Sequence, residues 1–334
     1  MNEFSNIKIP EELIAQTPIE NRSKSRLLYL NKETGIIKHY IFEDIVNLLT
    51  DKDVLVINNS RVIKARLNFE YKNKKCELML AAEQEKNIWD CIVYPGKYFK
   101  IGTRIKILNN IEIEVLDRTD YGRLIRFNCD RDIKEIYEKY GKIPLPPYIK
   151  KELNNSERYQ TVFSKEIGSI AAPTAGLHFT DELLSKLKDK GVDIFEITLH
   201  IGPGTFCPIK NIQTHKMHSE YVIITEKTAQ KINEAISAKK KIVAVGTTSV
   251  RALESAALKE KIISQFDGWT DLFIKFDYKF KIVDKLITNF HLPHSTLIVL
   301  TSAFAGIENI KKAYQIAIAE KYKFFSFGDA MFIE

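Results

Sequence analysis

The segment from Gly168 to Phe206 limits the fold more than any other, because it alternates strand, polar turn, helix, strand and polar turn. Thr180 is suited to cap the helix N-terminus, two carboxylates follow it in the first turn, and Gly191 is placed to end the helix. Each polar turn carries a histidine beside glycine and threonine. Loops of this kind on one face of an α/β unit are where such folds bind ligands. The segment therefore predicts an α/β domain with a ligand site at these loops.

The same pattern of strands and helices recurs in the remainder of the chain. Residues 54–57 and 242–245 are continuous apolar runs, as expected of buried strands. Further helices are expected at residues 228–240, 296–305 (with Ser295 as N-cap) and 308–322, and further strands near Phe273 and Leu286.

Between Ala65 and Asp130 the pattern changes to six short alternating segments separated by turn residues. Strands at this spacing predict a small antiparallel barrel or sandwich. A short helix and the stiff stretch P-L-P-P-Y-I-K-K follow it. We therefore predict an α/β main domain, formed by residues 1–64 and 151–334, with a small antiparallel β-barrel domain inserted as residues 65–150.

Composition narrows the class of protein. The 334 residues carry a formal net charge of +7, from 50 basic and 43 acidic side chains, which suits an anionic partner and an ordinary basic protein equally well. The polar N-terminus is unlike a secretory signal, and the longest uncharged apolar stretch, residues 296–307, is too short to span a membrane. We expect a cytoplasmic protein. Scattered cysteines without a C-x-x-C pair fit a reducing compartment, and these are Cys76, Cys91, Cys129 and Cys207.

Six of the seven histidines lie between residues 178 and 294, mostly where a strand meets a loop. Histidine is the side chain best matched to proton transfer near neutral pH, so this clustering is a catalytic signal. Metal binding competes with that interpretation, because His215 and His218, like His291 and His294, are separated by two residues. No carboxylate accompanies either pair in a recognised ligand pattern, so we expect no metal. For each single histidine, a structural hydrogen-bonding role remains open.

Two polar stretches directly follow buried strands. G-T-T-S-V-R, residues 246–251, opens a helix and brings backbone N–H groups, hydroxyls and an arginine together, as a carboxylate or phosphate requires. It lacks the glycine spacing of a dinucleotide fingerprint and the G-K-[ST] of a P-loop, and a plain helix start stays possible. N-N-S-R, residues 58–61, is costly to bury without partners and predicts a site or a buried hydrogen-bond network.

Taken together, these motifs resemble those of the S-adenosylmethionine:tRNA ribosyltransferase-isomerase family of queuosine biosynthesis. The matching stretches occur in the same order as in the family and extend along nearly the whole chain. Its stretches are N-N-S-R-V-I-K-A-R-L, P-L-P-P-Y-I, R-Y-Q-T-V-F, A-A-P-T-A-G-L-H-F, T-L-H-I-G-P-G-T-F, H-K-M-H-S-E, A-V-G-T-T-S-V-R-A-L-E, T-N-F-H-L-P-H-S-T-L, S-A-F-A-G and F-F-S-F-G-D-A-M. Departures are small: Lys64 replaces a usual proline, and residues 275–280 replace a usual P-G-Y or P-G-F turn.

The resemblance implies that the ribosyl part of S-adenosylmethionine is transferred to the aminomethyl group of a 7-deazaguanine in tRNA, with release of adenine and methionine. S-adenosylmethionine is then a consumed substrate, no cofactor is needed, and a monomer is expected. Such chemistry needs a base for the carbon beside the sulfonium, an acid for the departing adenine, and donors for an oxygen anion.

We expect His178, His218 and His291 to supply the acid and the base. Thr247, Thr248, Ser249 and Arg251 are expected to hold the methionine carboxylate or a tRNA phosphate. Asn59 and Arg61 are expected to contact the ribose or its developing charge. Further substrate contacts are expected from Thr174, Gly176, His200, Gly204, Thr205, Asn289 and Asp329. Two other classes stay open: a metal-dependent nucleotide hydrolase that uses the H-x-x-H pairs, and a tRNA-binding protein without catalysis.

Overall fold

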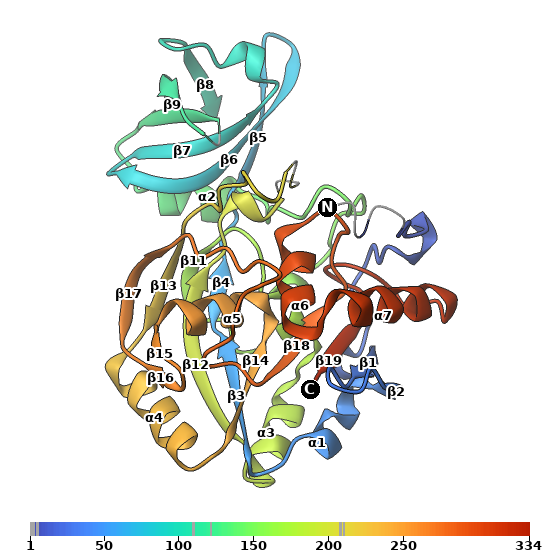
Figure 1. Cartoon of the computed structure of the whole chain (residues 1–334). Coiled ribbons are helices and arrows are strands. Elements are labelled where there is room, and N and C mark those ends of the chain that lie inside the picture. The colour runs from blue at the N-terminus through green and yellow to red at the C-terminus, as the bar shows by residue number, and fades with distance from the viewer. Residues whose placement is uncertain (1–3, 5–6, 109–110, 121, 207–208, 210) are drawn as a thin grey trace.

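The computed structural model describes residues 4, 7–108, 111–120, 122–206, 209 and 211–334, without the side chains of Thr205 and Phe206. The predicted contact of Thr205 and the cysteine Cys207 therefore lie outside the described residues. Two large sheets organise the chain, and Figure 1 shows the smaller one, at the top of the view, apart from the larger one below it.

The larger sheet has nine strands and is mixed. Its four central strands, β12, β3, β14 and β18, run parallel, and antiparallel strands flank them. In spatial order the strands are β17 (Phe266–Thr270), β13 (Glu220–Ile224), β12 (Asp193–His200), β3 (Asp53–Asn58), β14 (Lys241–Val245), β18 (Lys285–Asn289), β19 (Ala330–Ile333), β1 (Arg26–Leu30) and β2 (Ile37–Ile41).

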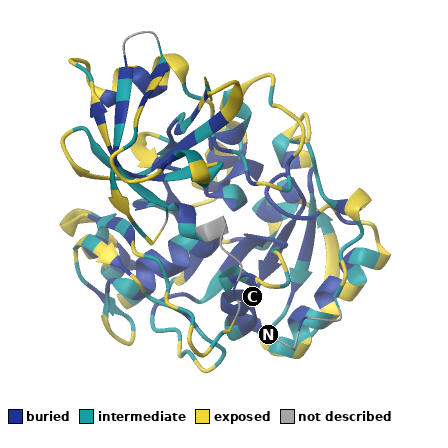
Figure 2. Cartoon of the chain, turned by 90° about the horizontal axis from the view of Figure 1, so that it is seen from above, coloured by how far each residue is buried: buried dark blue, intermediate teal, exposed yellow. Residues whose placement is uncertain are grey.

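Helices cover both faces of this sheet. Alternate residues of β3 point to opposite sides: Val54 and Val56 join one hydrophobic core, whereas Leu55 and Ile57 join another. The first core is completed by α4 (Glu226–Ser237), α5 (Gly246–Ser255), α6 (Thr296–Ala305) and α7 (Ile307–Ala319). The second is completed by α1 (Ile45–Leu48) and α3 (Asp181–Asp189). Burial is accordingly concentrated in the strands and the inner faces of the helices (Figure 2).

The smaller sheet is antiparallel and uses strands from one stretch of sequence. Its edge strands, β5 and β8, lie against each other, so the sheet is nearly closed around a separate core that α2 (Ile133–Tyr140) helps to cover. In spatial order the strands are β5 (Arg66–Tyr71), β6 (Lys74–Glu85), β7 (Ile88–Tyr94), β10 (Arg123–Asn128), β9 (Ile111–Arg118) and β8 (Arg104–Leu108). All six predicted strands are confirmed.

Short elements connect the sheets. Two small sheets pair β4 (Ser60–Val62) with β11 (Glu166–Ser169) and β15 (Ala257–Lys259) with β16 (Ile262–Ile263). The 3₁₀ turns are η2 (Glu11–Leu13), η3 (Arg22–Lys24), η4 (Phe42–Asp44), η5 (Gly96–Tyr98), η6 (Ser156–Tyr159), η7 (Thr174–His178) and η8 (Pro203–Phe206). No helix within the described ranges has the length and apolar character needed to cross a membrane.

The predicted ends of α3 and α6 are confirmed, whereas α7 ends at Ala319 and not at residue 322. Thr180 accepts a hydrogen bond from the N–H of Leu183, Ser295 caps α6 in the same way, and Gly191 follows α3 with φ of 88°. The helix expected from residue 228 begins at Glu226 instead, because Thr225 is its N-cap.

The prediction of a strand near Phe273 is wrong. Residues 271–284 form no strand, and β17 ends before them. The carboxylate of Glu254 accepts the backbone N–H groups of Lys281, Ile282 and Val283, so a side chain replaces the strand partner that this segment would need.

Candidate functional site

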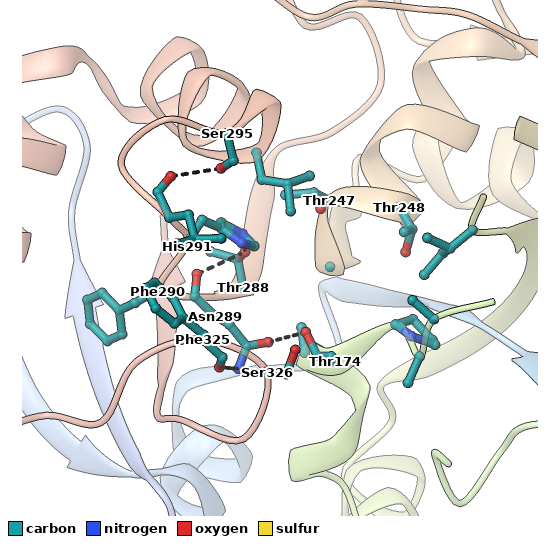
Figure 3. Close-up of a pocket in the computed structure, with 18 of the residues that line it drawn as sticks. Thr174, Thr247, Thr248, Thr288, Asn289, Phe290, His291, Ser295, Phe325 and Ser326 are labelled. Atoms are coloured by element: carbon teal, nitrogen blue, oxygen red, sulfur yellow. Dashed lines mark hydrogen bonds between the residues drawn. The ribbon is translucent and has the colours of Figure 1, made fainter. Parts of the chain in front are cut away.

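A pocket opens at the carboxyl ends of the parallel strands, which is where open α/β sheets bind ligands. Its walls come from the residues before and within η7, the start of α5, the end of β18, and the turn that contains Phe325 and Ser326 (Figure 3). The segment Gly168–Phe206 thus supplies residues 171–175 and Ile201 to the lining of the pocket.

The start of α5 offers hydrogen-bond donors to this pocket. Gly246 has φ of 86°, which a side chain would resist, and no side chain caps the helix at Val245. Thr247 and Thr248 line the pocket in the first helical turn, where backbone N–H groups lack helical partners. The Thr248 hydroxyl is buried without a hydrogen-bond partner. This wall is therefore suited to an anionic or strongly accepting ligand group.

The other two polar residues of that stretch are already engaged within the protein. Ser249 donates its hydroxyl to the carbonyl of Val245, 2.8 Å away. Arg251 lines the pocket, but its guanidinium is buried, pairs with Glu220 and donates to the carbonyls of Thr270 and Leu272. Arg251 thus joins α5 to the neighbouring strands.

Asn289, at the end of β18, is held by three partners (Figure 3). Its Nδ2 donates to the carbonyl of Phe325 at 3.3 Å, and a carbonyl can only accept, so this contact fixes which side of the amide is nitrogen. Its Oδ1 accepts from the Thr174 hydroxyl at 2.9 Å. The amide is therefore presented to the pocket in one orientation.

His178 lies behind Asn289 and lines a small separate cavity instead of the main pocket. Its Nε2 must accept from Asn289 Nδ2 at 3.2 Å, so Nδ1 carries the hydrogen and donates to the Ser25 hydroxyl at 2.7 Å. The ring also stacks on Phe42. Burial, with a smaller effect of the Arg22 charge, lowers the pKa of His178 to about 3. This ring is neutral and acts on the pocket only through Asn289.

His291 faces the main pocket directly. Its Nε2 is 2.8 Å from the Thr288 hydroxyl, and its backbone N–H donates to the Tyr314 hydroxyl. Burial lowers the pKa of His291 to about 3. At neutral pH the ring is therefore uncharged and has a lone pair that can accept a proton, although the lowered pKa makes it a weaker base than a free imidazole.

The pocket also has an aromatic wall that the sequence did not predict as site residues. Tyr148 and Phe325 lie with ring centroids 4.9 Å apart, and the Tyr148 hydroxyl is 2.8 Å from the Ser326 hydroxyl. Tyr159 completes the wall. Their stretches, P-L-P-P-Y-I, R-Y-Q-T-V-F and F-F-S-F-G-D-A-M, belong to the resemblance, but none of these three aromatic residues was predicted as a substrate contact. Thr288, beside the predicted Asn289, was missed as well.

A groove between the two sheets continues from the pocket, because Ile201 and Met217 line both. His200 and His218 line the groove and are absent from the main pocket. The His218 ring packs on Gly204 so closely that a Cβ there would lie 2.4 Å from its Cδ2. The His200 Nδ1 is 2.8 Å from the Ser60 hydroxyl, and burial lowers the pKa of His200.

The remaining predicted residues lie away from the pocket. Asn59 bonds to Glu196 and Thr198, within the buried hydrogen-bond network that its stretch predicted. Arg61 reaches Ser164 and Glu157. Gly176 faces Phe163 and Thr161, and Asp329 accepts the backbone N–H groups of Arg26 and Lys323.

No three His, Cys, Asp or Glu side chains in the described part of the chain are placed to hold a metal ion. The described cysteines, Cys76, Cys91 and Cys129, are free thiols.

Comparison with known proteins gives one consistent result. A family model described as queuosine biosynthesis protein matches residues 2–333. A protein of Clostridioides difficile named S-adenosylmethionine:tRNA ribosyltransferase-isomerase is 52% identical over 332 residues, or 98% of this chain and 97% of its own. A Thermoanaerobacter protein of the same name is 51% identical, with 98% and 97% covered. The crystal structure of S-adenosylmethionine tRNA ribosyltransferase from Thermotoga maritima is 38% identical, has a TM-score of 0.58, and matches over 99% of this chain and 100% of that one.

Proposed function

This chain belongs to the queuosine biosynthesis protein family, and from that premise we propose that it is an S-adenosylmethionine:tRNA ribosyltransferase-isomerase. It transfers and isomerises the ribosyl part of S-adenosylmethionine onto the 7-aminomethyl-7-deazaguanine base of tRNA, which gives epoxyqueuosine-tRNA and releases adenine and methionine. One observation carries this proposal: about half of the residues are identical to those of proteins with that name, over nearly the full length of both chains.

The main pocket is the proposed binding site of S-adenosylmethionine. The first turn of α5 supports a place for the methionine carboxylate, since backbone N–H groups and the unpartnered Thr248 hydroxyl meet there. The wall of Tyr148, Tyr159 and Phe325 offers flat apolar surface for the adenine. S-adenosylmethionine is proposed as a consumed substrate, and the protein needs no resident cofactor for this chemistry.

We assign His291 as the proton acceptor. The carbon beside the sulfonium must lose a proton, and His291 is the predicted catalytic histidine that lines the pocket in neutral form. His218, one residue beyond Met217, lines the groove and is absent from the main pocket, so it remains a candidate for proton transfer at the aminomethyl group of the tRNA base and not at the adenine. His178 is a positioning residue in this scheme, because it reaches the pocket through Asn289.

We further propose that residues 65–150 form a barrel domain inserted into one discontinuous α/β domain. Every strand of the six-stranded sheet lies between Arg66 and Asn128, whereas the nine-stranded sheet uses strands from both sides of that stretch. Because tRNA is the substrate, the protein is proposed to act in the cytoplasm, and we expect it to act as a monomer.

The test is direct. Purified protein is incubated with S-adenosylmethionine and tRNA that carries the aminomethyl precursor, and free adenine and methionine are measured. Release of both in equal amounts, with chelator present, is expected. Unmodified tRNA is the control and should release neither. Absence of adenine with the precursor-bearing tRNA would refute the proposal.

A further inference from the structure

Three ring-bearing side chains lie in a row across neighbouring strands of the large sheet. His200 on β12 is paired with Tyr221 on β13, and Tyr221 is paired with Trp269 on β17. Directly paired residues project from the same face of a sheet, and all three line the groove. We call His200, Tyr221 and Trp269 the ring row.

The ring row is held in place and remains open to the groove. The Tyr221 hydroxyl donates to Asp267 at 2.6 Å, and the Tyr221 and Trp269 rings are 5.2 Å apart. The His200 ring lies so close to Gly168 that a Cβ there would be 2.9 Å from it. Trp269 is nevertheless 60% exposed. Trp269 and its neighbour Tyr221 therefore present aromatic surface to the groove, which a flat partner can cover.

The opposite wall of the groove comes from the six-stranded sheet and α2. Trp89 and Tyr137 are its aromatic residues, and Lys134 adds a positive charge. Carboxylates such as Glu83 and Asp120 also line the groove, so its charge is mixed. A partner recognised mainly through flat faces fits this surface better than one recognised through phosphates alone.

We infer that this groove binds unpaired bases of the tRNA next to the target base, and that the ring row stacks on them. The inference rests on the proposed function and deepens it. An enzyme can reach the exocyclic group of a base only when the base is outside a stack, so the strand beside it must be unpaired or extruded. Aromatic side chains on a sheet face are a recurrent platform for such bases. Ile201 and Met217 link the ring row to the pocket, so a base continuing along this path reaches it.

The chain offers a built-in reporter for this contact. Its two tryptophans, Trp89 and Trp269, both line the groove. Titration with precursor-bearing tRNA should therefore quench the intrinsic tryptophan fluorescence, whereas a fully paired RNA duplex of equal length should quench it weakly. Quenching should lose a large part of its amplitude in Trp269→Phe. Unchanged fluorescence with tRNA would overturn the inference, and is the result expected if the groove instead receives a protein.

Steady-state kinetics separate this inference from the proposed function. We expect Trp269→Ala to raise the KM for tRNA about tenfold, within the range of stacking on one base, while kcat and the KM for S-adenosylmethionine stay within about twofold of wild type. Trp269→Phe should retain most of the tRNA affinity.

The matched control is Tyr94→Ala, which removes another exposed ring, 70% accessible, outside the groove. If Trp269→Ala has an unchanged KM for tRNA and normal adenine release, the stacking of the ring row on tRNA is refuted and the proposed reaction stands. If tRNA quenches the fluorescence of the wild type without release of adenine, the proposed reaction is refuted and tRNA binding in the groove stands.

Discussion

At the scale of single residues, position assigns different tasks to histidines that the sequence could not tell apart. His178 and His291 are both neutral, since burial lowers the pKa of each to about 3. The first has both ring nitrogens engaged with Ser25 and Asn289, whereas the second faces the pocket. Position decides that only His291 can meet a substrate there.

Replacing His291 with glutamine should therefore lower kcat for adenine release about 100-fold or more, because a proton acceptor contributes at least that much. Thermal melting should show that the fold survives. His294→Gln is the matched control: it removes the other histidine of the same H-x-x-H pair, which is exposed and does not line the pocket. A His291→Gln rate close to wild type would remove His291 from the mechanism.

The pKa of His178 also predicts how stability depends on pH. In the folded protein the ring stays neutral down to about pH 3, whereas an unfolded histidine takes up a proton below about pH 6.5. The unfolded state therefore binds more protons between these values, and the free energy of unfolding falls as pH is lowered through that window. This stabilisation is fully present above about pH 6.5.

Urea titrations at pH 7, 6 and 5 measure the effect. In His178→Gln, the loss of unfolding free energy between pH 6 and 5 should be smaller than in wild type by about 1.2 kcal/mol. If the free energy of unfolding depends on pH equally in the two proteins, His178 binds a proton in the folded state over this pH range as it does in the unfolded state. The variant should also lower kcat, since Asn289 loses a partner.

At the scale of elements, one buried ion pair joins three of them. Arg251 on α5 pairs with Glu220 on β13 and donates to the carbonyl of Thr270 on β17. Both charged side chains are nearly inaccessible. Removing one partner leaves a buried charge uncompensated, whereas removing both can be nearly neutral.

Arg251→Met should accordingly lower the free energy of unfolding by about 3–5 kcal/mol. Adding Glu220→Gln should recover a substantial part of that loss, although the carbonyls of Thr270 and Leu272 remain without their donor. Chemical denaturation of the single and double variants measures both. If Arg251 acts chiefly on substrate, the single variant will instead keep its stability and lose affinity for S-adenosylmethionine.

Sequence patterns predicted the elements well and the pocket in part. Thr247 and Thr248 were identified because a polar stretch directly follows a buried strand, which is a local signal. Tyr148 and Phe325 were missed because one follows an extended proline-rich stretch and the other sits at φ of 69°, where neither helix nor strand periodicity applies. The partner of Arg251 was unpredictable for a different reason: Glu220 is 31 residues away and no local pattern connects them.

At the scale of the whole molecule, the groove lies between two sheets with separate hydrophobic cores. The ring row belongs to one wall, and Trp89 and Lys134 belong to the other. An RNA strand in the groove would contact both sheets at once, so its affinity should combine stacking with phosphate neutralisation.

The affinity for tRNA should therefore fall as salt rises. In a plot of log affinity against log salt, Lys134→Gln and Lys216→Gln should each reduce the slope by about 1, because each removes one groove cation. Lys239→Gln is the control, since this exposed residue precedes β14 at the opposite end of the sheet. Filter binding at several salt concentrations measures the slopes. Equal slopes for all three variants and wild type would place the phosphates elsewhere.

The fixed amide of Asn289 has a consequence for which ligand groups it can tolerate. Both of its N–H hydrogens are engaged, one with His178 and one with Phe325, and one lone pair of its oxygen is engaged with Thr174. What remains for a ligand is the second lone pair of Oδ1. Asn289 therefore discriminates by polarity: an amino or hydroxyl group placed against it is bonded, and a carbonyl or ring nitrogen in the same place is repelled, without any change in the shape of the pocket.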